Sequence, residues 1–99
     1  MSTSVSVDHD AFVLDMDGAR AKLEFSVEDG RLYLVHTEVP SQFQGQGVGG
    51  RLVSAALEKA RAEGLTIVPW CPYARRWLEE HPDRAGDVNI DFATRRPSV

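Results

Sequence analysis

The sequence has little cysteine and no long apolar run, and each shortage excludes a class of protein. Cys71 is the only cysteine, so an internal disulfide and a cysteine-based zinc cluster are excluded, and a reducing compartment is expected. No uninterrupted apolar stretch approaches the roughly 20 residues that a membrane-spanning helix needs. The first ten residues, MSTSVSVDHD, contain no basic leader and no apolar segment, so we expect a cytoplasmic protein with no membrane partner.

Positive charge is also in short supply. The formal net charge of −4 argues against general binding of nucleic acid, which depends on a cationic surface. No set of His, Asp and Glu has the spacing of a metal site, so no metal is expected. The first thirty residues are rich in carboxylates. These side chains either form a solvated face on edge strands or attract a cationic substrate. They are Asp8, Asp10, Asp15, Asp17, Glu24, Glu28 and Asp29.

A length of 99 residues suits one domain, here an ordered core over about residues 5–92 and a polar tail over 93–99. The N-terminal part is expected to form an antiparallel meander, because the turn signals DG and EDG separate segments rich in alternating β-branched or aromatic residues. The predicted strands are 11–16, 20–27 and 31–39.

A helix and another strand follow the meander. Apolar residues recur with helical spacing over 48–63, and 65–69 has the low polarity of a parallel strand that is covered on both faces. Pro72 suits the first turn of a second, shorter helix that Pro82 stops, and an edge strand is expected near 88–92. We therefore predict an α/β (α+β) fold, in which the meander is followed by a β-loop-α-β unit and a short C-terminal helix.

Four glycines lie within FQGQGVGG at 43–50, directly ahead of the predicted helix. A glycine-rich turn at the start of a helix can direct backbone N–H groups at an anion. A plain strand-to-helix turn that needs unusual φ values explains the glycines equally well. Gly45, Gly47 and Gly50 formally match Gly-x-Gly-x-x-Gly, but a dinucleotide-binding fold places this motif after its first strand and an acidic residue at the end of the next strand. Neither condition holds, and no Gly-Lys-Ser/Thr follows for a nucleotide triphosphate loop.

A third pattern fits better. Gln44-x-x-Gly47-x-Gly49 resembles the Gln/Arg-x-x-Gly-x-Gly/Ala pyrophosphate loop of the GCN5-related N-acetyltransferases, which bind acetyl-CoA. Residues 34–83 look like the small, single-domain branch of that superfamily, in which His-Thr-Glu-Val-Pro leads into the glycine loop and Cys-Pro precedes a short helix ending in His-Pro. The resemblance covers most of residues 8–92. Gln44 stands where this branch commonly has arginine, so one charge that faces phosphate is missing.

The resemblance implies an acetyl-CoA-dependent N-acetyltransferase that transfers an acetyl group to a primary amine. Acetyl-CoA (coenzyme A) would be the co-substrate and an amine the acceptor, and the two would meet in the gap between the strands at 31–39 and 65–69. Pantetheine would pair with the strand before the loop, and the pyrophosphate would lie on the loop. The cofactor-binding residues implied are Thr37, Glu38, Val39, Gln44, Gly45, Gln46, Gly47, Val48, Gly49 and Gly50.

Three residues are candidates for catalysis, and core packing is the alternative role for each. Cys71 lies at the entrance of the second helix, a position that favours a thiolate. His36 is a candidate general base and is expected on the same strand face as Leu34 and Glu38. Tyr73 is a candidate acid for the departing thiolate.

Two other functions stay open from the sequence. One is a CoA-binding or partner-binding module with little turnover, and the other is a purely structural or interaction protein. A monomer or weak homodimer is expected, with the edge strand at 88–92 as a contact surface. Three arginines are expected partners for cofactor phosphates: Arg51, Arg75 and Arg76.

Overall fold

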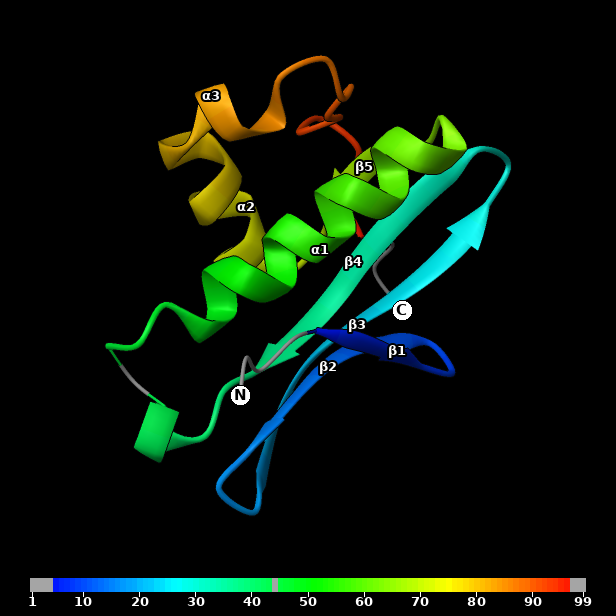
Figure 1. Ribbon diagram of the computed structural model, residues 1–99. Helices are drawn as coiled ribbons and strands as arrows, with labels where there is room; N and C mark the ends of the chain where they lie inside the picture. Colours follow the sequence, from blue (N-terminus) through cyan, green and yellow to red (C-terminus); the bar gives the residue numbers. More distant parts are fainter. Residues whose placement is uncertain (1–4, 44, 97–99) are drawn as a thin grey trace.

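The computed structural model describes residues 5–43 and 45–96. They form a five-stranded sheet in the order β1-β2-β3-β4-β5, and α1 lies across one face of it (Figure 1). The predicted α/β fold is therefore confirmed. The elements are β1 (Ser6–Asp8), β2 (Ala11–Met16), β3 (Ala19–Glu28), β4 (Arg31–Glu38), the 3-10 turn η1 (Ser41–Phe43), α1 (Val48–Glu63), β5 (Thr66–Pro69), α2 (Pro72–Glu80) and α3 (Pro82–Ala85).

The first four strands form an antiparallel meander, and β5 pairs with β4 in parallel after the α1 crossover. Three of these four strands were predicted from their alternation. The first, β1, was missed because three residues are too few to show a period of two. No helix within the described residues is long and apolar enough to span a bilayer.

The helix α1 has the bounds that its apolar spacing predicts. Gly64 ends it in the left-handed conformation (φ 67°) and donates its backbone N–H to Ala60 O, as expected of a C-terminal cap. The buried side of α1 packs on the face of the sheet that we call the inner face; the opposite face is the outer face. The core between α1 and the inner face contains, among others, Phe12, Leu14, Leu23, Phe25, Leu32, Leu34, Leu52, Val53 and Leu57.

One extra residue in β4 changes the register between β3 and β4. Leu34 lies opposite Phe25 and His36 lies opposite Glu24, so Val35 has no counterpart in β3. Side chains of a strand point alternately to the two faces, and an inserted residue reverses that alternation from there onward.

The reversal decides which residues of β4 reach the inner face. Leu34 is buried there before the shift, and after the shift Thr37 lies opposite the buried Leu23. His36 and Glu38 are exposed on the outer face. The expectation that His36 shares a face with Leu34 is therefore wrong, because the shift depends on pairing with β3 and leaves no mark in the alternation of β4 itself.

The strand β5 ends before β4 does. Their parallel pairing extends from Arg31 opposite Thr66 to Leu34 opposite Pro69, and Cys71 N then donates to Leu34 O (2.8 Å). β4 continues to Glu38, and none of the described residues of β5 pairs with this last part. The last part of β4 therefore has no pairing partner in β5, and it lies where the resemblance placed the cofactor.

The C-terminal part differs from its prediction in two ways. Pro82 begins the short helix α3 after α2 ends at Glu80, because the fixed φ of proline suits a first helical turn as well as it stops a preceding one. The edge strand expected at 88–92 is reduced to one parallel bridge between Ile67 and Ile90. A single bridge is insufficient to form a strand.

The carboxylate of Asp91 holds this C-terminal segment at the start of β4 through Arg31. Asp91 accepts hydrogen bonds from Arg31 Nη1 (2.8 Å), Thr94 Oγ1 (2.6 Å), Thr94 N (3.0 Å) and Ala93 N (2.9 Å). The bonds from Thr94 and then Arg31 hold the pKa of Asp91 far below its usual range. Ionised Asp91 therefore links the segment to β4 at neutral pH.

Candidate functional site

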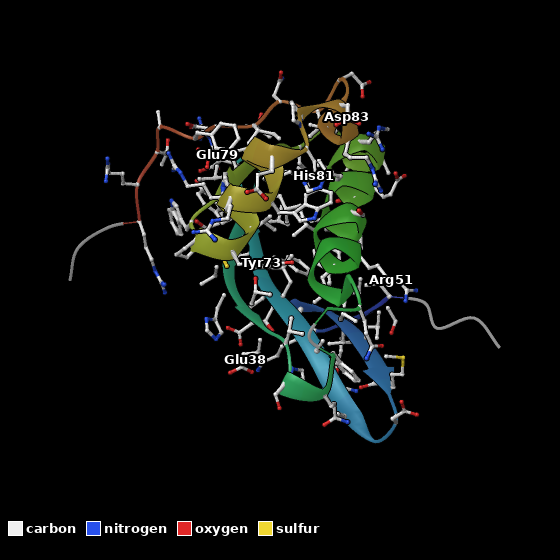
Figure 2. All side chains as sticks on the ribbon, turned by 90° about the vertical axis from the view of Figure 1, so that its left-hand side faces the viewer. Glu38, Arg51, Tyr73, Glu79, His81 and Asp83 are labelled. Carbon is white, nitrogen blue, oxygen red and sulfur yellow. The ribbon has the colours of Figure 1, made fainter. Side chains whose placement is uncertain are left out.

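A cavity of about 340 Å³ lies where β4 ends and α1 begins. It collects most of the residues that the sequence assigned to the cofactor, together with one candidate catalytic residue. Figure 2 shows that one, Tyr73, on α2 with its side chain directed toward the start of α1. We call this hollow the loop cavity. Its lining is Thr37, Val39, Phe43, Gly45, Gly47, Val48, Gly49 and Tyr73.

The glycines of this segment have two different structural roles. Gly45 (φ 79°) and Gly47 (φ 70°) adopt the left-handed conformation, which glycine takes without strain. Gly49 lies inside α1, where an added Cβ would overlap the phenol of Tyr73. A Cβ on Gly50 would lie 2.7 Å from Nε1 of Trp77. The first pair shapes the turn, and the second pair lets α2 approach α1 closely.

Other predicted cofactor residues do not line the loop cavity. Gln46 is exposed and its amide Nε2 donates to Gln42 O (3.0 Å). Glu38 is on the outer face, and Gly50 lines a neighbouring groove described below. Gln44, the residue that replaces the usual arginine, lies outside the described residues.

A thiol and a hydroxyl meet across the gap between β4 and the start of α2. Cys71 is 3% exposed, and its Sγ is 3.0 Å from Oγ1 of Thr37, with either atom able to donate. Thr37 also lines the loop cavity, whereas Cys71 is not among its lining residues. The sequence pointed to both residues but did not predict their contact, because it depends on where β5 ends relative to β4.

Tyr73 is two residues beyond Cys71 and belongs to the same cavity. Partial burial of the phenol, followed by the effect of the nearby Cys71, raises the pKa of Tyr73 above its ordinary value of about 10. The phenol therefore stays protonated at neutral pH. It is a hydrogen-bond and proton donor directed into the cavity.

His36 and Glu38 form a separate group on the outer face. His36 Nε2 is 3.5 Å from Glu38 Oε1, and the side chains are 54% and 57% exposed. Lys22 Nζ lies 3.3 Å from Glu24 Oε2 and 3.5 Å from Glu38 Oε2, and Glu24 in particular raises the pKa of Lys22. The three candidate catalytic residues are therefore divided: His36 is on one side of β4, and Cys71 and Tyr73 are on the other.

A second hollow of about 290 Å³, which we call the α1–α2 groove, adjoins the loop cavity. It includes Arg51, one of the three arginines expected to contact phosphate. Arg75 instead donates from Nη1 to Phe92 O (2.8 Å), and Arg76 lines neither hollow. Ser54, His81 and Arg84 also line the groove and were missed as site residues. Ser54 is on α1, whereas His81 lies between α2 and α3 and Arg84 on α3, so nothing in the sequence indicates that Ser54 faces the other two.

Among residues 5–43 and 45–96, no group of His, Cys, Asp and Glu side chains is arranged to hold a metal ion. The groups that face the loop cavity are instead a phenol, a hydroxyl and backbone at the start of a helix. Such groups can hold a phosphate and donate protons to a leaving group.

Comparison with known proteins agrees with this arrangement. A family model described as GCN5-related N-acetyl-transferase matches residues 11–88. Protein NATD1 of Xenopus tropicalis is 33% identical over 88 residues, which cover 82% of this chain and 81% of the relative. Protein NATD1 of Gallus gallus and that of Homo sapiens are each 32% identical over 85 residues, covering 79% of this chain and 77% and 75% of the relatives. The resemblance inferred from the sequence is confirmed: the chain belongs to the GCN5-related N-acetyltransferase family.

Proposed function

We propose that the protein transfers the acetyl group of acetyl-CoA to a primary amine of a small molecule or a protein. One observation carries the proposal: the loop cavity joins the glycine turn, the phenol of Tyr73 and the part of β4 that continues beyond the end of β5. A thioester bound there would have a phosphate site on one side and a proton donor beside its sulfur.

The glycine turn is the proposed site of the CoA pyrophosphate. Gly47 is the N-cap of α1 and supplies no capping side chain, so the N–H groups of the first turn face the cavity end of the helix. Those N–H groups and the helix dipole favour an anion. The left-handed conformations of Gly45 and Gly47 keep Cβ atoms out of the path of a phosphate.

The end of β4 is the proposed site of the pantetheine arm. Beyond Leu34 no described residue of β5 pairs with β4, so β5 does not cover this edge of the strand. An extended amide-containing arm can bind such an edge like an added strand. This placement would bring the thioester next to Thr37, Cys71 and Tyr73.

The proposed reaction is direct attack by the amine. The amine nitrogen forms a bond to the acetyl carbonyl carbon, the bond from that carbon to sulfur breaks, and the electron pair leaves on the CoA sulfur. Tyr73 protonates this thiolate and afterwards regains a proton from water. The proton lost by the amine passes to His36, which Glu38 orients from 3.5 Å, if the acceptor approaches from the outer face.

The alternative route passes the acetyl group through Cys71. The thiol is 3% exposed and already in contact with Thr37 Oγ1, so a thioester has poor access to it. We therefore assign Cys71 a packing role beside Thr37, with no acetyl group carried on its sulfur. Mass spectrometry of the protein after incubation with acetyl-CoA alone tests this assignment, because an acetyl adduct on Cys71 would contradict it.

Two measurements test the proposed function. Acetyl-CoA should bind in isothermal titration calorimetry and raise the melting temperature, and a panel of primary amines should release CoA and gain an acetyl group. Binding without turnover of any amine would indicate a CoA-binding module instead. Absence of binding would contradict both functions.

A further inference from the structure

The α1–α2 groove meets the loop cavity at the glycine turn. Gly47 and Tyr73 line both hollows, so a ligand on the turn has access to each of them. Figure 2 labels Arg51 near the start of α1 and His81 just after α2. The rest of the groove lining is Gly50, Arg51, Ser54, Trp77, His81 and Arg84.

The groove is positively charged, although the protein is acidic. Its charged lining residues are Arg51 and Arg84, and no described carboxylate lines it, whereas the whole chain has a formal net charge of −4. A local excess of positive charge with low-dielectric walls attracts an anion.

Arg84 is held in place by neutral groups. Its Nη2 donates to Oγ of Ser54 (3.3 Å), and its guanidinium lies over the ring of Trp77, 5.8 Å from the ring centre. No carboxylate of the described part of the chain forms an ion pair with it. A guanidinium positioned in this way keeps its charge and its remaining N–H donors for a ligand, and its fork of donors matches phosphate.

His81 is also fixed at this groove. Its ring stacks on Trp77 with centroids 4.2 Å apart, and its Nδ1 is 2.8 Å from Trp77 O. Because a carbonyl oxygen can only accept, Nδ1 must carry a hydrogen. The other ring nitrogen, Nε2, takes no part in this bond, so the groove contains a second oriented polar group beside Arg84.

Resting on the proposed function, we propose that the α1–α2 groove binds the ribose 3′-phosphate of CoA through Arg51 and Arg84. CoA has two sites of phosphate charge, the pyrophosphate and the separate 3′-phosphate on the ribose. If the pyrophosphate lies on the turn and pantetheine follows β4 through the loop cavity, the ribose must leave the turn on another side. The groove adjoins the turn and is lined by cations, so it suits the remaining phosphate.

The test compares CoA with dephospho-CoA, which lacks only the 3′-phosphate. In calorimetry at fixed ionic strength, the wild-type protein should bind CoA roughly tenfold or more tightly than dephospho-CoA, since a charge-assisted hydrogen bond contributes at least that factor. The variants Arg84→Met and Arg51→Met should each bind CoA several-fold more weakly. Both should bind dephospho-CoA with the affinity of the wild type.

Two further variants make the result specific to the groove. Arg76→Met removes the same charge from an exposed position of α2 that lines neither hollow, and it should keep the full preference for CoA. Arg84→Lys should restore part of the preference that Arg84→Met loses. Circular dichroism confirms that each variant is folded.

The outcomes separate this inference from the function it rests on. Equal affinity of the wild type for the two nucleotides, or the same loss of preference in Arg76→Met as in Arg84→Met, would overturn the groove assignment while leaving acetyl-CoA binding intact. Failure of both nucleotides to bind would overturn the proposed function and the groove assignment together.

Discussion

The two ends of β4 differ in how they meet the neighbouring chain. At its start, β4 is paired with β5 from Arg31 to Leu34, and Arg31 binds Asp91 of the C-terminal segment. At its end, β4 extends past the last residue of β5, and Thr37 contacts Cys71 beside the loop cavity. We call these the closed end and the open end.

The difference between the two ends indicates that one part of β4 stabilises the fold and another part contributes to the candidate site. The closed end combines backbone pairing with an ion pair, so substitutions there should lower stability and leave catalysis unchanged in the folded protein. The open end combines a cavity with a phenol, a hydroxyl and a thiol, so substitutions there should change activity or ligand binding more than stability. The predictions below test this division, beginning with the largest expected effect.

Tyr73→Phe should separate an effect on activity from an effect on stability most clearly. Loss of a general acid typically slows a reaction by about 10²–10⁴-fold, and we expect kcat to fall within this range. The free energy of unfolding should change by no more than about 0.5 kcal/mol, because the ring is kept. Steady-state kinetics and urea unfolding measure the two quantities, and an unchanged kcat would show that Tyr73 only fills space.

Gly49→Ala should disturb the open end from the helix side. The new Cβ would overlap the Tyr73 phenol, and overpacking of this kind costs about 1–3 kcal/mol. Gly45→Ala is the matched control: its Cβ meets nothing within 4 Å, but its φ of 79° is strained for alanine. It should cost about 1–2 kcal/mol and leave the packing of Tyr73 unchanged.

The same pair of variants can also contradict the division of the glycines. Near-UV circular dichroism reports the packing of the aromatic side chains, and the part of the signal that Tyr73→Phe removes is assigned to Tyr73; only Gly49→Ala should change that part. If Gly45→Ala changed that signal and Gly49→Ala did not, the turn glycines and the packing glycines would have been assigned to the wrong roles.

Thr37→Val should remove the hydroxyl that contacts Cys71 while keeping the shape of the side chain. A hydrogen bond contributes about 1 kcal/mol, so the loss in stability should be near that value. If the pair lines the bound thioester, the affinity for acetyl-CoA should fall as well. Cys71→Ala in the same titration shows whether the effect comes from the contact or from Thr37 alone.

Asp91→Asn should weaken the closed end, with the smallest effect of the four. Because the pKa of Asp91 is lowered in the folded protein, its contribution to stability is present above the unfolded aspartate value of about 3.9 and is lost as the pH falls below it. The variant should therefore melt at a lower temperature than the wild type at pH 7, and the two should converge at acid pH.

Activity at 25 °C is the second readout for Asp91→Asn, and it should equal that of the wild type. Asp10→Asn serves as the control, since Asp10 is exposed and forms no ion pair among the described residues. A loss of activity without a loss of stability would show that the closed end also shapes the site, which would contradict the division.

Much of this fold could be read from the sequence because the signals are local. The bounds of α1 follow from helical spacing and from Gly64, and the strand order follows from tight turns and a β-loop-α-β connection. The glycine turn and the end of β4 were correctly expected to adjoin, since one leads directly into the other.

Features that depend on packing between distant segments could not be predicted from the sequence. The register shift at Val35 depends on β3, and it moved His36 away from the inner face. The packing role of Gly49 depends on α2, and Arg84 reaches the α1–α2 groove only through the arrangement of three helices.

The unmatched residue Val35 gives the length of β4 a functional meaning. Upstream of Val35 the inward-facing positions must satisfy the core, and downstream a different set of positions faces inward. Removal of Val35 would let His36 follow Leu34 directly and would keep Thr37 opposite Leu23, whereas an insertion or deletion after Val35 would bring a neighbouring residue to that position. A change of length after Val35 would therefore exchange the side chains offered to a ligand, without any substitution in the site itself.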